Sequence, residues 1–432
     1  MNPLLHTLPN GVRLLAVPMP QLQSASVGVF LRVGSRNETP ASNGVSHVLE
    51  HMAFKGTTTR SVQAINLDAE RLGADVNAFT SKDTTAYFMT GLGRHLDQLL
   101  GFTADIVLNS TFPEAELRRE LEVIRQEAIE YEEDPQESSA DLLDRAIWGE
   151  HAMGMPVIGT LENIERFTRD DLVAHVKAHY VAGNTVVAAA GSFDVQAFFA
   201  RAGTLFGGMP VHPAGRPADP PAGTYAGHAL GRRFTQVSQV FVNLAYPVAP
   251  PSAQEMPQPQ WRVAATVAAM LFGGGMSAPL ADTLRERLGL AYTAQADPES
   301  GDNWFNIVVH AVTTPDKLAQ LVAATGGLLR AHAEAVDPVQ LERAKNQLTV
   351  ARVRASESTF AAMERAVEEL FLRGSVTPAA DVLAMIDAVT AQDVRSVFER
   401  ALMHPPALAI TGKGATAKSA GQLAAALVAV SR

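Results

Sequence analysis

Residues 44–57 read GVSHVLEHMAFKGT and bring His47, Glu50 and His51 within five consecutive positions. Residues three and four apart share one face of a helix, so both imidazoles can point at one ion while Glu50 lies beside them. This order, His-x-x-Glu-His, inverts the commoner His-Glu-x-x-His pattern, which the chain lacks. Alone, the five residues also fit a solvated helix face or buried histidines, so the interpretation as a metal site depends on a third ligand.

Residues 113–134 predict a long acidic helix that can supply this third ligand. Its apolar residues recur at helical spacing and define a buried stripe, namely Leu117, Leu121, Ile124 and Ala128. Glu120 and Glu127 fall within about 20° of each other on such a helix and flank the stripe, so both can reach inward. Two histidines and one distant carboxylate give a tetrahedral zinc ion three ligands and leave its fourth position for water, with Glu50 as the general base.

With this carboxylate in place, the chain resembles the inverzincin peptidases of the pitrilysin group, peptidase family M16. It is similar to their short two-domain form, such as the beta subunit of the mitochondrial processing peptidase. Residues 120–127 read ELEVIRQE and fit the family segment E-x-x-V-I-x-x-E. The resemblance implies one zinc ion (Zn²⁺) per chain, held by His47, His51 and Glu127. It also implies that Glu120 is a supporting carboxylate that orients a ligand.

A second resemblance concerns substrate binding. Asn77, Ala78 and Phe79 are similar to the family strand whose edge pairs with the backbone of a peptide substrate. Residues 273–292 read GGGMSAPLADTLRERLGLAY and resemble a run that ends in R-E-x-x-G-L-A-Y. In the family, the residues at the places of Arg285 and Tyr292 hold the substrate and stabilise the developing oxyanion. Taken alone, this pair also fits a salt-bridged helix end and a core tyrosine.

The glycine-rich loop departs from the family pattern. After Gly273-Gly274-Gly275-Met276-Ser277, the family usually has a small residue followed by Arg-Leu, whereas this chain has Ala278-Pro279-Leu280. We therefore expect the loop to contact its partner or substrate differently.

Length and an internal repeat indicate two domains. The chain has 432 residues, and residues 70–73 match residues 286–289 in the sequence Glu-Arg-Leu-Gly. We predict an N-terminal zinc-binding peptidase domain over 1–208 and a linker rich in Pro, Gly and Ala over 209–228. A homologous C-terminal domain over 229–432 lacks the zinc motif and carries the Arg/Tyr pair.

The expected fold class is α+β, with two homologous α/β-roll domains, each a mixed sheet covered by helices. Strands and helices that do not alternate strictly favour this class. The patterns predict strands over 12–17, 26–33 and 237–244, and helices over 64–72, 94–109, 169–179, 264–271, 315–335, 338–356 and 361–372. By resemblance, the two domains form half of a four-domain clamshell.

Composition excludes several classes of protein. The absence of cysteine excludes disulfides and thiol catalysis, and the net charge of −10 argues against a nucleic-acid partner. The first residues show no signal peptide, and no apolar run is long enough to span a bilayer. We expect no membrane partner and a cytoplasmic location, with the periplasm as the alternative. His175 and His179 also stand four apart, but without an acid between them we expect a structural pair.

The predicted function is that of a zinc metalloendopeptidase that cleaves peptides or unfolded polypeptide segments inside a closed chamber. Two alternatives remain: a non-catalytic or heterodimer-dependent subunit like those of the processing peptidase, and a peptide-binding module. Non-catalytic relatives typically lose part of the zinc motif, which this chain retains. Two chains would complete the clamshell, and a homodimer is more economical than a heterodimer because one chain carries both the zinc motif and the Arg285–Tyr292 pair.

Overall fold

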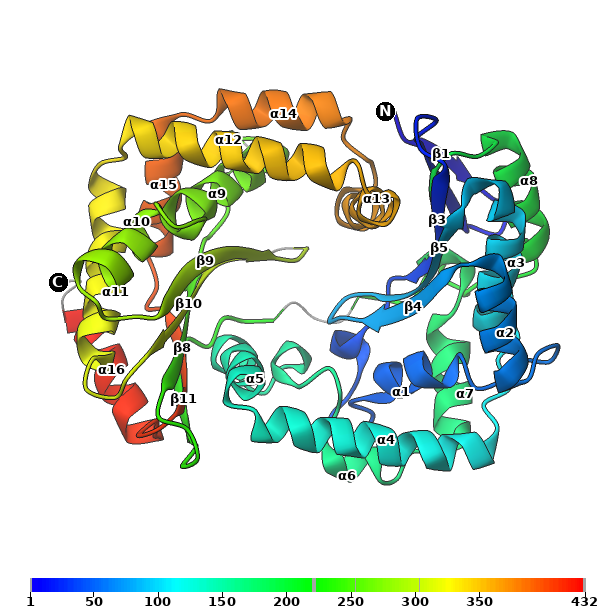
Figure 1. Cartoon of the computed structure of the whole chain (residues 1–432), viewed down its shortest axis with the longest axis horizontal. Helices are drawn as coiled ribbons and strands as arrows, with labels where there is room; N and C mark the ends of the chain where they lie inside the picture. Colours follow the sequence, from blue (N-terminus) through cyan, green and yellow to red (C-terminus); the bar gives the residue numbers. More distant parts are fainter. Residues whose placement is uncertain (1, 220–222, 253, 303, 430–432) are drawn as a thin grey trace. The chain divides into compact units, whose positions relative to one another are not determined.

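A computed structural model describes residues 2–219, 223–252, 254–302 and 304–429 (Figure 1). The chain forms two units, each built around one mixed β-sheet. Unit 1 comprises Met1–Ile129, Met155–Pro221 and Val353–Ala379, and unit 2 comprises Glu130–Gly154, Ala222–Arg352 and Ala380–Arg432. Each unit therefore contains chain from both halves of the sequence.

The sheet of unit 1 has the strand order β1-β2-β6-β3-β5-β4. Its strands are β1 Leu4–Thr7, β2 Arg13–Pro18, β3 Ser24–Leu31, β4 Asp75–Thr80, β5 Thr85–Leu92 and β6 Thr185–Gly191. β2 and β6 pair in parallel and every other pair is antiparallel. The strands predicted over 12–17 and 26–33 correspond to β2 and β3.

The sheet of unit 2 repeats this arrangement in the order β7-β11-β8-β10-β9. Its strands are β7 Ala229–Arg233, β8 Val240–Pro247, β9 Thr293–Ser300, β10 Phe305–Thr313 and β11 Ala407–Gly412. They take the places of β2, β3, β4, β5 and β6 with the same parallel and antiparallel senses. The predicted duplication, with two mixed sheets covered by helices, is confirmed.

Helices cover both faces of each sheet. Those lying mainly in unit 1 are α1 Val45–Met52, α2 Val62–Leu72, α3 Leu96–Leu108, α4 Glu114–Glu133, α6 Leu161–Ile164, α7 Arg169–His179, α8 Val195–Phe206 and α13 Thr359–Arg373. Those lying mainly in unit 2 are α5 Pro135–Trp148, α9 Gln258–Gly273, α10 Pro279–Ala281, α11 Leu318–Glu334, α12 Pro338–Ala355, α14 Ala379–Ala388, α15 Ala391–Ala401 and α16 Ala417–Ala429. No helix in the described part of the chain is long and apolar enough to cross a membrane.

Two of these helices are exchanged between the sequence halves. One face of the first sheet packs on α13, whose Met363 and Leu370 contact the cluster containing Phe30 and Val186. One face of the second sheet packs on α5, whose buried apolar residues form one cluster with Ala245, Val308 and Ala409. The other face of each sheet carries the main core. Apolar strand residues that point to both faces explain why each sheet needs a second covering helix.

The exchange gives the packing units a different composition from the sequence halves predicted over 1–208 and 229–432. Amphipathic periodicity indicates that α5 and α13 bury one face, but it does not say against which sheet. The predicted linker over 209–228 includes residues 220–222, which lie outside the described residues. Its extent, and the boundaries of the two halves, remain a prediction.

Candidate metal centre

Helix α1 places the predicted ligands on the face opposite its core residues. Val48 and Leu49 are almost completely buried in the core of unit 1. The helical spacing then brings His47 and His51 to the other face, where their side chains are 12% and 23% exposed. Their rings lie 4.8 Å apart in an edge-on arrangement. The predicted common face of the two histidines is thus present.

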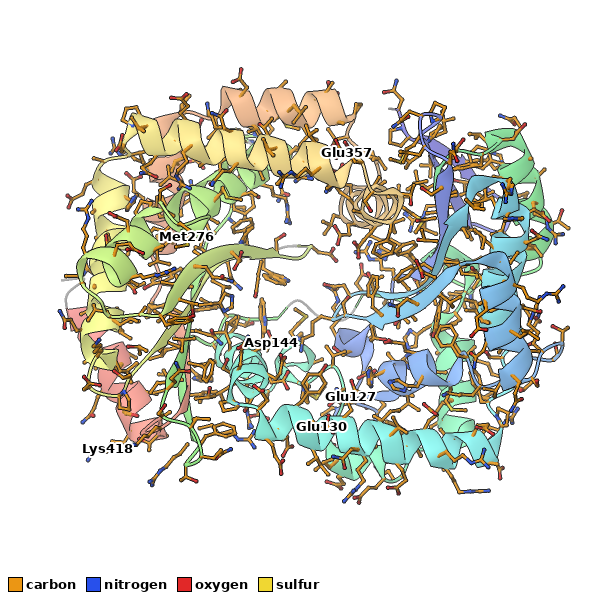
Figure 2. The ribbon with its side chains drawn as sticks, viewed as in Figure 1. Glu127, Glu130, Asp144, Met276, Glu357 and Lys418 are labelled. Atoms are coloured by element: carbon orange, nitrogen blue, oxygen red, sulfur yellow. The ribbon has the colours of Figure 1, made fainter. Side chains whose placement is uncertain are left out.

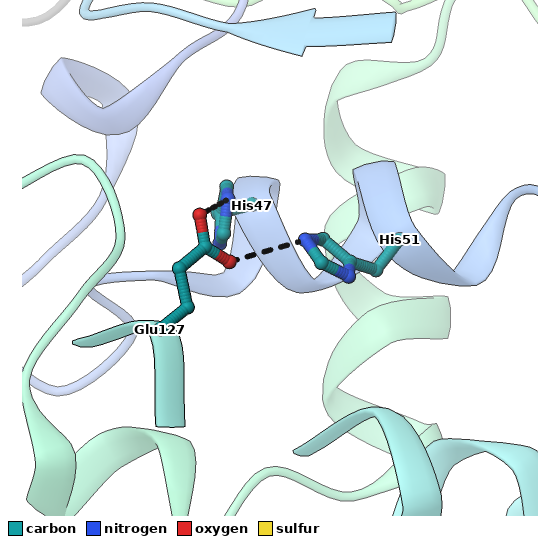
Figure 3. A group of neighbouring side chains, drawn as sticks. All are labelled: His47, His51 and Glu127. Atoms are coloured by element: carbon teal, nitrogen blue, oxygen red, sulfur yellow. Dashed lines mark ion pairs between the residues drawn. The ribbon is translucent and has the colours of Figure 1, made fainter. Parts of the chain in front are cut away.

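Glu127 on α4 completes the cluster. Its Oε1 lies 4.0 Å from Nε2 of His47, and its Oε2 lies 3.6 Å from Nε2 of His51 (Figure 3). Figure 2 shows the same glutamate on the side of α4 that faces α1. Ligand atoms of a tetrahedral zinc ion stand roughly 3.3–3.6 Å apart, given bonds of about 2.0–2.2 Å. Within the described residues, these three are the one group of histidines, cysteines and acids close enough to hold a metal ion.

The chemistry of the three side chains fits zinc. Burial, together with the neighbouring charge of His51, lowers the pKa of His47 to about 4. The His47 imidazole is therefore neutral at physiological pH and keeps a lone pair for a metal ion. Its Nδ1 is buried and has no hydrogen-bond partner among the described residues. Two imidazole nitrogens and one carboxylate form a donor set typical of catalytic zinc.

Glu120 lies beside His51, and its role as a supporting carboxylate remains a prediction. Its Oε2 lies 3.2 Å from Nδ1 of His51, and its Oε1 lies 2.7 Å from Nζ of Lys55. A proton on Nδ1 directed at this carboxylate leaves Nε2 unprotonated towards Glu127. Lys55 was not predicted, although its position four residues after His51 was a usable signal.

Glu50 is held between α1 and the edge strand β4. Burial raises the pKa of Glu50, while hydrogen bonds from Thr80 and the neighbouring His51 act in the opposite direction. A carboxyl group with a raised pKa beside a metal position suits a general base. Since Thr80 is the last residue of β4, this strand contacts the proposed base directly.

Strand β4 lies at the edge of its sheet and contains Asn77, Ala78 and Phe79, as predicted. It pairs with β5, with Asn77 opposite Phe88. No other strand of the described chain pairs with it. An edge strand presents unpaired backbone groups, the requirement for adding a further strand. The pairing with substrate remains a prediction.

Arg285 and Tyr292 lie in unit 2, at places that leave both accessible. Arg285 belongs to a π-helical segment, Asp282–Arg287, and its side chain is 42% exposed beside Glu286. Its Nη1 lies 3.5 Å from Sδ of Met276 in the glycine-rich loop, a residue labelled in Figure 2. Tyr292 is 75% exposed, so the interpretation as a core tyrosine is wrong. Their role towards substrate remains a prediction.

The Ala278-Pro279-Leu280 departure has a structural basis. Pro279 begins α10, and Ala278 and Leu280 are fully buried. A proline at the first helical position fits because its missing N–H has no partner there.

The second pair of histidines shows no third ligand. The rings of His175 and His179 lie 4.6 Å apart on α7, and Nε2 of His175 lies 3.4 Å from Oγ of Ser46. Burial lowers the pKa of His175 to about 3, which keeps it neutral. Among the described residues, no further histidine or acid completes a metal-binding group with this pair, and its structural role remains a prediction.

The chain is similar to several known proteins. Residues 13–161 match the family model described as "Insulinase (Peptidase family M16)", and residues 166–348 match "Peptidase M16 inactive domain". An uncharacterized zinc protease of Streptomyces coelicolor is 32% identical over 419 residues, which cover 94% of this chain and 88% of that protein. An uncharacterized zinc protease of Bacillus subtilis is 29% identical over 408 residues, covering 94% and 97%.

A solved structure shares the fold. The crystal structure of a protease from Helicobacter pylori superposes with a TM-score of 0.84 and 21% identity, covering 95% of this chain and 99% of that one.

Proposed function

Because the chain belongs to peptidase family M16, we propose that it is a zinc metalloendopeptidase that hydrolyses peptide bonds. The observation that carries the proposal is the meeting of His47 and His51 on α1 with Glu127 on α4. Glu50 adds a proton acceptor on the same short helix. The curated relatives are named as zinc proteases, which supports this activity.

The side chains divide the chemistry among them. When bound, zinc would supply Lewis acidity, which lowers the pKa of water and polarises a substrate carbonyl. Glu50 accepts a proton from the attacking water and passes it to the leaving amine, so water adds across the peptide bond as that bond breaks. Glu120 keeps His51 in the tautomer that presents Nε2.

Strand β4 is the proposed binding site for the substrate backbone. Its free edge can pair with an extended peptide, and its Thr80 contacts Glu50. A peptide aligned along Asn77, Ala78 and Phe79 would bring successive carbonyl groups past the base. This arrangement favours unfolded segments, since a folded chain already uses its backbone groups internally.

Arg285 and Tyr292 are the proposed contribution of unit 2. A guanidinium and a phenol can both donate to an oxyanion, and the accessibility of this pair leaves them available to a substrate. We further propose that two copies of the chain close a chamber around the substrate, with a related partner chain as the alternative to a homodimer.

A non-catalytic subunit and a peptide-binding module are the competing functions. The match of residues 166–348 to a domain described as inactive concerns the part of the chain without the metal motif. The complete set of His47, Glu50, His51 and Glu127 favours catalysis over both alternatives.

The proposal is tested with purified protein and a mixed library of unfolded peptides. Cleavage is measured as isolated, with a chelator, and after zinc is restored, alongside Glu50→Gln and the matched control Glu122→Gln, which changes an exposed glutamate of α4. We expect zinc-dependent cleavage that Glu50→Gln lacks and Glu122→Gln retains. Bound zinc without cleavage would overturn the peptidase and favour a binding role or a missing partner chain.

A further inference from the structure

We propose that Glu38 is a positioning residue that holds the N-terminus of α1 and thereby sets where His47 and Glu50 stand relative to Glu127. The inference rests on the proposed function. It concerns a residue outside the motif, nine positions before His47.

Glu38 is a buried carboxylate whose two oxygens both accept hydrogen bonds at the start of α1. The residue is only 5% exposed. Oε2 accepts from the backbone N–H of Gly44 at 2.8 Å and from Nδ2 of Asn43 at 3.1 Å. Oε1 accepts from the backbone N–H of Ser46 at 2.8 Å. The residue after Ser46 is His47, the first proposed ligand.

The helix needs this external partner because its own cap position is a glycine. Gly44 has φ 102° and no side chain, so it supplies no acceptor for the first N–H groups of α1. Those groups need acceptors. Glu38 provides them from a distance in sequence, in place of the Ser, Thr, Asp or Asn usual at this position.

Glycine is required at position 44 for a second reason. A Cβ added there would lie 2.8 Å from Cα of Gly159. The close approach of two backbones thus excludes a capping side chain and leaves the task to Glu38.

The segment between Glu38 and α1 is itself fixed to the rest of unit 1. Nδ2 of Asn43 also donates to the carbonyl oxygen of Pro156 at 2.9 Å. Nδ2 of Asn163 donates to the carbonyl oxygen of Asn43 at 3.0 Å. Glu38 therefore connects α1 to a fixed frame, and the helix cannot shift along its axis without breaking these bonds.

A short helix makes this fixation matter for the metal site. α1 has eight residues, a length of about 12 Å, so a tilt at its start moves every side chain on it. His47 and Glu50 would then leave their places over Glu127, which belongs to a different helix. Supporting residues of metal sites typically change metal affinity about 10- to 100-fold, and we expect this range for Glu38.

The test compares wild type with Glu38→Gln, Glu38→Asp and the control Glu122→Gln. The dissociation constant for zinc is measured by competition with a chelator, and kcat and KM are measured on a peptide that the wild type cleaves. We expect Glu38→Gln to weaken zinc binding about 10- to 100-fold and to lower kcat with little change in KM. Glu38→Asp keeps the carboxyl group but reaches fewer donors, so we expect a smaller loss, while the control matches wild type.

A purely structural role would lower thermal stability and leave the zinc dissociation constant of the folded protein unchanged. That result in Glu38→Gln overturns the inference; should this variant fail to fold, unchanged zinc affinity in Glu38→Asp does so. Wild type that binds no zinc contradicts the proposed function and the inference together. Wild type that binds and cleaves, with variants that match it, contradicts the inference alone.

Discussion

Helices α1 and α9 occupy equivalent places in the two sheets but have opposite surroundings. α1 lies between β3 and β4 in sequence, and α9 lies between β8 and β9. Matching residues 51–54 with 269–272 sets Ala265, Ala268 and Ala269 of α9 against His47, Glu50 and His51 of α1. All three alanines are completely buried. In the same fold, the methyl groups of α9 therefore pack in the core. The equivalent face of α1 instead carries polar side chains that form a site.

The helices that contact them differ in the same way. In unit 1, α4 reaches α1 through the carboxylates of Glu120 and Glu127, which meet its side chains. In unit 2, α12 reaches α9 through Arg343, whose Nη2 donates to the carbonyl oxygen of Leu271 at 2.7 Å. A cation at the last turn of a helix is a structural partner. Side-chain contacts in unit 1 are therefore available for a ligand, whereas those in unit 2 support the backbone.

Removal of Glu127 should have the largest effect on the difference between α1 and α9. Glu127→Gln takes away the only carboxylate among the proposed ligands and should make α1 as unable to hold zinc as α9. We expect a loss of zinc affinity greater than the about 10- to 100-fold of a supporting residue, and no turnover. Zinc content after dialysis measures this, with Glu122→Gln as the control. Stoichiometric zinc in Glu127→Gln would contradict the ligand assignment.

The pH dependence of stability should distinguish the two helices next. Burial raises the pKa of Glu38 from 4.5 to about 7, with hydrogen bonds from Gly44 and Ser46 opposing. The folded protein therefore holds this proton more tightly than the unfolded chain. The resulting stabilisation is complete below about pH 4.5 and is lost as the pH rises through about 7. It amounts to about 3 kcal/mol at most, given about 1.4 kcal/mol per pKa unit.

Urea unfolding of wild type and Glu38→Gln between pH 5 and pH 8 measures this contribution. We expect the unfolding free energy of wild type to fall relative to that of the variant over this interval. A difference between the two proteins that stays constant with pH would show that Glu38 does not titrate there. At the start of α9, the N-cap residue Pro257 provides no side-chain cap.

Transplanting a ligand to α9 should fail. Ala269→His adds an imidazole at a completely buried position, and overpacking of this kind costs about 1–3 kcal/mol. We expect a lower urea midpoint and no additional zinc. The control Ala351→His changes an exposed alanine of α12 and should leave the midpoint almost unchanged. Unchanged stability of Ala269→His would mean that α9 is not packed as described.

The supporting carboxylate should give the smallest effect on the metal site. Glu120→Gln removes the charge between His51 and Lys55, so the tautomer of His51 is less firmly set. We expect zinc to bind about 10- to 100-fold more weakly, with His47 and Glu127 still in place. Chelator competition measures the constant, and an affinity equal to wild type would show that Glu120 does not orient its neighbour.

Local spacing made the candidate metal site predictable from the sequence. His47 and His51 share a helical face whatever the rest of the chain does, and Glu127 projects from the same side of α4 as its buried stripe. Glu38 was missed because its contacts depend on burial, which the sequence does not reveal for a charged residue in a loop. Strand β6 was missed because all seven of its residues are buried, so it shows no alternation.

The exchange of α5 and α13 bears on how the protein is made. The first sheet has all its strands once residue 191 has been synthesised, but the helix that covers its second face ends at residue 373. At about 5–20 residues per second, a ribosome needs roughly ten to forty seconds to reach it. During that interval Phe30 and Val186 lack the helix that covers them in the folded protein. For the same reason, a gene cut at the repeat boundary would encode two halves that each lack the helix covering one face of their sheet.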